Sequence, residues 1–240
     1  MKSYLLFLSV ALFLGGCGGS SGDGNTVAQR ANSSACFNES LYSVGTVVNE
    51  VNAVIFNGES LSNYSETTEV IQKTSYRGYN DAIEEKITDG SGSDNRLYIL
   101  VDQTEKNVTT LGQILGSDEI TYRPNGFVLN YDLALGEKKT FSTVTEYENN
   151  ALSNTTDYSL EYLRTENITV PAGTFETCVL EFVVDNVDAS GDRLKVVFTQ
   201  YIGVGNGLTI REDFVSTAEN GETMTGSDKL FSATINGNPI

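Results

Sequence analysis

The residues of this chain that could do chemistry are its carboxylates and cysteines, because its 240 residues include no histidine. Without imidazole the chain cannot form the usual catalytic triads, histidine-bearing zinc sites or imidazole general bases. A glycosidase would place paired carboxylates beside aromatic platforms, but the chain has no tryptophan, and 32 aspartates and glutamates form accidental pairs readily. We therefore expect a protein that is not an enzyme and that uses no cofactor.

Two acidic turns could bind calcium. The first, DGSGSDN at 89–95, offers Asp89 and Asp94, and the second, DNVDASGD at 185–192, offers Asp185, Asp188 and Asp192. Neither turn has the alternating spacing of an EF-hand loop or a nonapeptide repeat. Asp and Asn at hairpin tips commonly bind their own backbone, so we expect these turns to be structural and free of metal.

The first cysteine, Cys17, follows an export signal. Lys2 precedes the apolar stretch YLLFLSVALFLGG (4–16), which is shorter than the roughly 20 residues that span a bilayer. The Leu-Gly-Gly triplet directly before Cys17 resembles a bacterial lipobox, in which Ala or Ser is commoner at the position of Gly15 and the cysteine is acylated. The sequence thus predicts a signal peptide at 1–16 and a lipid anchor on Cys17. Because Gly18 is not aspartate, we expect sorting to the outer membrane of a Gram-negative bacterium.

The other two cysteines, Cys36 and Cys178, lie in the folded part of the chain. Residues 17–33 are rich in glycine and serine and predict a flexible tether, so a single domain is expected at 34–240. A reactive or metal-binding thiol pair would need nearby histidines, and an oxidising envelope favours pairing. We therefore expect one disulfide between Cys36 and Cys178.

Apolar residues alternate with polar ones over most of the chain after residue 44, which is typical of half-buried strands. In TCVLEFVV, for example, Cys178, Leu180 and Phe182 share one face. Closely spaced turn signals leave no room for helical crossovers. The pattern predicts an all-β, antiparallel, strongly curved sheet of roughly ten strands, folded as a β-sandwich or an open or half barrel. Short helical turns at 38–44 and 107–115 could cover an open end.

A tight hairpin is expected in NITVPAGTFETC, residues 167–178. Pro171 has the φ angle of the second position of a type I turn, and Gly173 suits a following left-handed position. Together they predict a three-residue hairpin loop with a bulge.

The surface chemistry excludes one class of partner and leaves others open. A formal net charge of −17 repels phosphate backbones, so nucleic-acid binding is excluded. Most of the 12 tyrosines are expected to pack as half-buried strand residues, and a few exposed together could form a binding surface.

Four segments of the chain resemble a group of uncharacterised Gram-negative envelope lipoproteins. They are ACFNESLYSVGT (35–46), LGEKKTF (135–141), VPAGTFETC (170–178) and QYIGVG (200–205), with a VPAGTF hairpin and a later Y-x-GVG segment. The chain departs from that group at Phe141, where tryptophan is common. The resemblance implies a β-rich fold and an envelope location, and it transfers no catalytic residue.

Three functions follow as hypotheses. The first is a non-enzymatic, outer-membrane-anchored lipoprotein whose periplasmic or surface β domain binds or supports another envelope component. The second is a carrier or receptor for a hydrophobic ligand, a lipid or acyl chain, in a cavity of the curved sheet. An apolar cavity of several hundred Å³ would favour the second, and a filled core with an exposed tyrosine patch the first. The third is calcium-dependent adhesion at the acidic turns.

Overall fold

The structure, a computed structural model, describes residues 27–240. The expected signal peptide, Cys17 and most of the tether lie outside the described residues. The described chain forms two 3₁₀ helices and a 16-stranded sheet. The elements are η2 (Ser34–Cys36), η3 (Glu39–Tyr42), β1 (Val47–Phe56), β2 (Glu59–Ser60), β3 (Tyr64–Tyr76), β4 (Tyr79–Asp89), β5 (Asp94–Asp102), β6 (Asn107–Leu115), β7 (Asp118–Arg123), β8 (Phe127–Asn130), β9 (Lys138–Thr140), β10 (Val144–Glu148), β11 (Ala151–Val170), β12 (Gly173–Asp188), β13 (Arg193–Gly203), β14 (Thr209–Ala218), β15 (Thr223–Ile235) and β16 (Asn238–Pro239). Neither described helix is long and apolar enough to cross a membrane.

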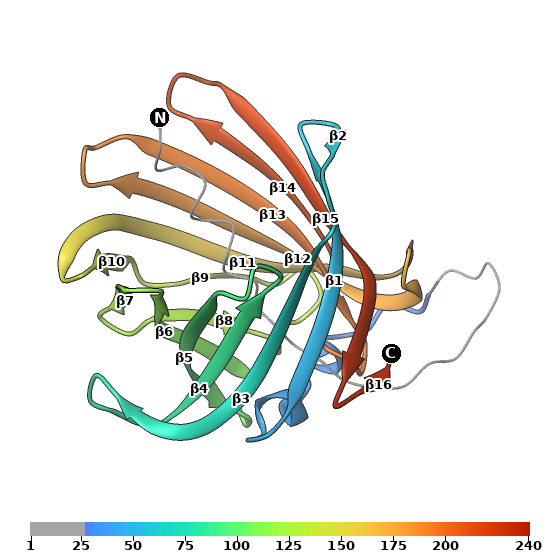
Figure 1. Cartoon of the computed structure of the whole chain (residues 1–240). Coiled ribbons are helices and arrows are strands. Elements are labelled where there is room, and N and C mark those ends of the chain that lie inside the picture. The colour runs from blue at the N-terminus through green and yellow to red at the C-terminus, as the bar shows by residue number, and fades with distance from the viewer. Residues whose placement is uncertain (1–26) are drawn as a thin grey trace.

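The sheet closes into a barrel (Figure 1). Strands pair antiparallel in chain order, and β1 then pairs with β15, where Val48 lies opposite Ile235. The closed ring holds twelve strands, β1, β3–β7 and β10–β15, while β2, β8, β9 and β16 pair outside it. The all-β antiparallel class and the disulfide are confirmed. The expected ten strands and the sandwich or open barrel are wrong, because a long twisted sheet can pair its own edges and so leave none exposed.

The two expected helical turns differ in outcome. Residues 38–44 include the 3₁₀ helix η3, in which the Asn38 side chain accepts a hydrogen bond from the Ser40 backbone. Residues 107–115 instead form β6, which pairs with β5, β7 and β8. The run Val108-Thr109-Thr110 explains the difference, since β-branched residues favour strands and three partner strands satisfy the backbone.

The chain before β1 packs across one end of the barrel. The Ser33 amide donates to the Leu133 carbonyl at 2.9 Å, and the Gly205 amide donates to Ala35 at 2.8 Å. The Gln29 side chain donates to the Thr165 carbonyl at 2.8 Å. Residues before the expected boundary at 34 therefore lie on the barrel, and the tether cannot extend as far as residue 33.

The disulfide joins this N-terminal segment to the barrel wall. Cys36 bonds Cys178 of β12, with their Cα atoms 6.2 Å apart, and neither residue is exposed. Around the bond lies the main hydrophobic core, which includes Leu41, Tyr42, Tyr131, Leu133, Leu180, Ile202, Leu208 and Leu230. We call this apolar part of the interior the disulfide half.

The hairpin between β11 and β12 is present with a shorter loop than expected. Val170 lies opposite Gly173, so only Pro171 and Ala172 form the loop. Gly173 has a φ of 146°, a positive angle that favours glycine, but the ladder shows no register shift at this residue, so the expected bulge is wrong. The ladder simply continues through Gly173, and the Ala172 amide donates to the Leu230 carbonyl of β15 at 3.1 Å.

Candidate functional site

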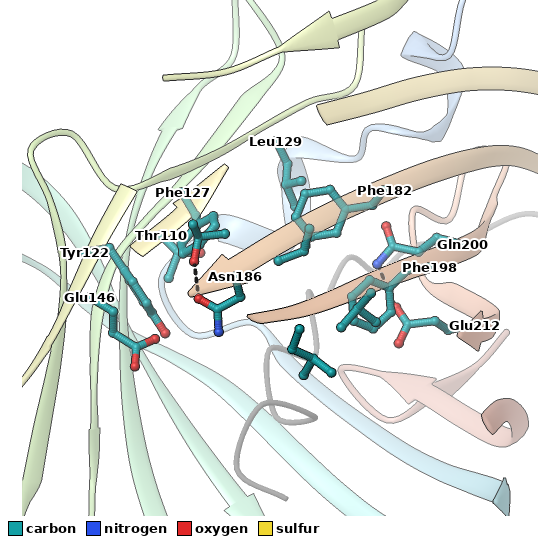
Figure 2. Close-up of a pocket in the computed structure, with 14 residues that line it drawn as sticks. Thr110, Tyr122, Phe127, Leu129, Glu146, Phe182, Asn186, Phe198, Gln200 and Glu212 are labelled. Atoms are coloured by element: carbon teal, nitrogen blue, oxygen red, sulfur yellow. Dashed lines mark hydrogen bonds between the residues drawn. The ribbon is translucent and has the colours of Figure 1, made fainter. Parts of the chain in front are cut away.

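A cavity of about 100 Å³ occupies the barrel interior away from the disulfide. Half of its 14 lining residues are apolar, and they come mainly from β8, β12 and β13. Figure 2 shows Phe182, Phe198 and Leu129 among these walls, with polar side chains on either side. Phe182 and Phe198 are only partly buried although they face inward, so solvent reaches the cavity. We call this part of the interior the cavity half.

Aromatic rings follow one another around the wall of the cavity half. Phe182, Phe198 and Phe214 lie directly opposite one another on β12, β13 and β14. Their ring centroids are 5.9 and 6.2 Å apart. Tyr158 extends the row, with its ring centroid 5.8 Å from that of Phe182, and Phe127 lies 4.9 Å from Tyr158. These separations fall in the range of attractive ring pairs, so the row is a preformed apolar wall.

A polar network borders this wall on one side. The Asn154 amide donates to Glu146 Oε1 at 2.8 Å, and the Asn186 amide donates to Asn154 Oδ1 at 3.2 Å. Thr156 Oγ1 donates to Asn186 Oδ1 at 3.0 Å. Burial raises the pKa of Glu146, and this effect outweighs the hydrogen bond from Asn154, which lowers it. Three of these side chains, Glu146, Thr156 and Asn186, line the cavity.

A carboxyl pair borders the wall on the other side. Glu212 lines the cavity from β14 and lies opposite Asp228 of β15. The Gln200 amide donates to Glu212 Oε2 at 2.7 Å, the contact drawn in Figure 2. Burial raises the pKa of Glu212 to about 7 and that of Asp228 to about 6. Asp228 Oδ1 is buried without a hydrogen-bond partner among the described residues.

A second carboxyl pair follows on the adjoining strands. Glu50 of β1 lies opposite Glu66 of β3, and burial raises their pKa values to about 8 and about 7. Burial, and after it the charges of Asp228, Glu66, Glu50 and Glu212, raise the pKa of Tyr64. Glu85 of β4 lies instead between Val70 and Leu97 of the main core, is 4% exposed and has a pKa raised to about 8 by burial.

The calcium candidates do not gather into a site. Asp89 Oδ1 accepts from the Ser91 and Ser93 amides at 2.8 and 3.1 Å, and Asp94 pairs with Lys86 at 2.8 Å. In the part of the chain that the structure describes, no three His, Cys, Asp or Glu residues are arranged to hold a metal ion. The first acidic turn therefore serves its own hairpin.

The second acidic turn has the same construction. Asp188 Oδ1 accepts from the Ser190 and Asp192 amides at 2.8 and 3.0 Å. Asp185 forms a bidentate ion pair with Arg193, with both contacts at 2.6 Å. The carboxylates that the sequence offered as ligands thus bind backbone amides and an arginine.

Sequence reasoning missed the buried carboxyl groups. Ile210, Glu212 and Phe214 alternate on one face of β14, so the inward position of Glu212 is visible in the pattern. Glutamate in a strand is normally assigned to the solvent face, since a buried carboxyl is costly unless paired. The available signal was a glutamate in register with apolar neighbours.

Comparisons with known proteins add little to this geometry. No known protein family and no curated protein sequence matches the chain. Two solved structures share part of the fold, each with a TM-score of 0.49 over 80% of this chain and 96% of theirs. One is a candidate lipoprotein from Parabacteroides distasonis with 17% identity, and the other is a candidate exported protein with a YmcC-like fold from Bacteroides fragilis with 13% identity. A likeness at this level does not inform the function.

Proposed function

We propose that this protein is a non-enzymatic, lipid-anchored envelope protein that binds a small, largely apolar molecule in the cavity half of its barrel. The observation that carries the proposal is the solvent-reachable cavity walled by Phe182, Phe198 and their aromatic neighbours. The lipobox before Cys17 supports anchoring at the outer membrane of a Gram-negative bacterium, as argued from the sequence.

The size of the cavity limits the ligand. At 10–15 Å³ for each water, about 100 Å³ holds about seven to ten waters or a molecule of similar heavy-atom count. The cavity is smaller than the several hundred Å³ expected for a carrier of lipids. We therefore propose a receptor for a small molecule with a ring, and not a carrier of acyl chains.

The outer surface favours this function over binding of a protein partner through tyrosines. Among the described large apolar side chains that are strongly exposed, Tyr64 is the one tyrosine, at 36%, and it shares the inward face of β3 with Glu66. Tyr76 and Tyr98 stack at 4.0 Å, but Tyr76 is only 8% exposed. The other described tyrosines are buried or half-buried, so no group of strongly exposed tyrosines forms a docking surface.

A pair of neighbouring valines on β13 tests the proposal. Val196 lines the cavity, and Val197 points to the opposite face of the strand. Val196→Phe should fill the cavity and abolish binding of 2-phenylethanol measured by NMR titration, while Val197→Phe should leave binding intact. The barrel, its N-terminal segment and the disulfide lie within 27–240, so a chain from Gly18 secreted into an oxidising compartment keeps every described contact. If Val196→Phe binds as the parent does, the cavity is not the site.

A further inference from the structure

The cavity half is an acidic chamber without an internal cation. Glu212 lines the cavity, Asp228 lies opposite it, and Glu50 and Glu66 face each other on the adjoining strands. None of the 14 lining residues is Lys or Arg. The ion pairs formed by described residues involve other carboxylates, and Arg211, beside Glu212 in sequence, pairs with Asp213 at 2.7 Å. No cation among the described residues forms an ion pair with any of these four groups.

Several of these carboxyl groups also lack hydrogen-bond partners. Within residues 27–240, Glu66 Oε1 and Asp228 Oδ1 are buried and unpartnered. Glu50 is 5% exposed and lies between Glu66 of β3 and Ala233 of β15. Gln200 reaches only Oε2 of Glu212, which leaves Oε1 for another donor. Buried polar atoms in folded proteins are nearly always hydrogen-bonded, so the unfilled acceptor of Asp228, directly opposite the cavity-lining Glu212, calls for a donor.

We propose that the cavity binds an organic cation, a primary ammonium group on a small aromatic body, with the ammonium at Glu212 and Asp228 and the ring on Phe182 and Phe198. This inference rests on the proposed function and specifies its ligand. An ammonium supplies three donors and the positive charge that the chamber lacks. The ring faces add an attraction for cations, and the row of rings offers stacking for the apolar body.

Two further observations favour an organic cation over a metal ion. The described carboxylates do not form a group that could hold a metal. The apolar wall between the Glu146 network and the Glu212 pair also suits a molecule with a carbon body. Burial holds the pKa of Glu212 near 7, so an arriving ammonium would displace protons from the chamber.

Three probes of nearly equal size separate the ligand class from the existence of the site. They are 2-phenylethylamine, the uncharged 2-phenylethanol and anionic phenylacetate, titrated by calorimetry at pH 7 into the chain from Gly18. We expect the amine to bind at least about tenfold more tightly than the alcohol, and phenylacetate not to bind. Amine binding, unlike alcohol binding, should release protons, seen as a heat that changes with the ionisation enthalpy of the buffer.

Two variants connect the preference to the carboxyl groups. Glu212→Gln should reduce amine affinity about tenfold or more and alcohol affinity by much less. Glu69→Gln, a matched change on the exposed face of β3, should alter neither. Asp228→Asn is the second test of the same pair in case Glu212→Gln does not fold.

The outcomes distinguish the two proposals. Equal affinity for amine and alcohol would overturn the proposal of a cationic ligand, while the proposed binding of a small apolar molecule would still hold. An amine preference that survives both Glu212→Gln and Asp228→Asn would overturn the assignment to these residues. Absence of binding by all three probes would overturn both proposals.

Discussion

The two halves of the barrel interior are built from the same strands and yet differ in chemistry. On β12, Cys178 and Leu180 belong to the disulfide half and are fully buried, whereas Phe182 and Asn186 reach the cavity. One half is densely packed and covalently tied to the N-terminal segment, and its buried polar atoms include the Tyr42 and Tyr131 hydroxyls, which have no described hydrogen-bond partner. The other keeps empty volume, unpaired carboxyl groups and polar networks, all of which cost stability. The comparison indicates that the disulfide half stabilises the fold. This stability offsets the cost of the empty volume and polar groups that the cavity half needs for binding.

Removal of the disulfide should have a larger effect on stability than any other change proposed for the two halves. The bridge joins residues 142 apart in sequence. In the chain-entropy account, Cys178→Ser should lower the free energy of unfolding by about 3–5 kcal/mol, measured by urea unfolding. The affinity for 2-phenylethanol at low temperature should be kept, since the cavity residues lie elsewhere. Equal urea midpoints for oxidised and reduced parent protein would contradict a stabilising role of the bridge.

Two leucines give a matched comparison of the halves. Leu180 is fully buried in the core, and Leu194 is a half-buried wall of the cavity. Leu180→Ala should cost about 2–5 kcal/mol, because it leaves a void in packed surroundings. Leu194→Ala should cost roughly 1 kcal/mol and should alter ligand affinity, because it enlarges a space that solvent already reaches. Equal losses in urea unfolding would mean that both halves carry the stability.

The class of this fold could be predicted because its signals are local. The alternation in TCVLEFVV and the two remaining cysteines required no knowledge of distant contacts, and both the strand and the disulfide are present. Closure of the barrel could not be predicted, since it depends on β1 meeting β15 across nearly the whole chain. The β15 sequence TMTGSDKLFSATI has a weak apolar alternation, so its pairing was not visible.

The candidate site was harder to predict for a different reason. A glutamate such as Glu50 normally marks an outward position, and the pattern therefore suggested a solvated face. The structure turns it inward, opposite Glu66 and without a counter-charge. The acidity that composition attributed to solubility is thus partly internal. That placement follows from register, which a single sequence does not reveal.

The buried carboxyl groups make stability depend on pH. Glu50 titrates near 4.5 when unfolded and near 8 when folded, so between these values only the folded state keeps the proton. The stability that Glu50 contributes is then fully present below about pH 4.5 and is lost as pH rises through 8. Glu85, whose pKa is raised in the same way, acts in the same direction. We expect a Tm that is higher at pH 5.5 than at pH 8.5.

A substitution at Glu50 isolates this contribution. Glu50→Gln should stabilise the protein by about 2–3 kcal/mol at pH 8.5 and by little at pH 5.5, because the amide never ionises. Exposed Glu69→Gln is the control and should change neither Tm. If Glu50→Gln shifts Tm equally at both pH values, the effect is packing and not ionisation.

The hairpin beside the disulfide half gives a last, modest test. Gly173 has a φ of 146°, which side chains rarely adopt, yet an added Cβ would meet nothing closer than Phe175 at 3.5 Å. Gly173→Val should therefore cost about 1–2 kcal/mol through backbone strain alone. Ala172→Val, at a residue without a positive φ, should cost less. Because this hairpin packs against Leu230 in the disulfide half, Gly173→Val should lower the urea midpoint without changing ligand affinity. A loss of affinity at unchanged stability would instead show that the two halves are coupled through β12.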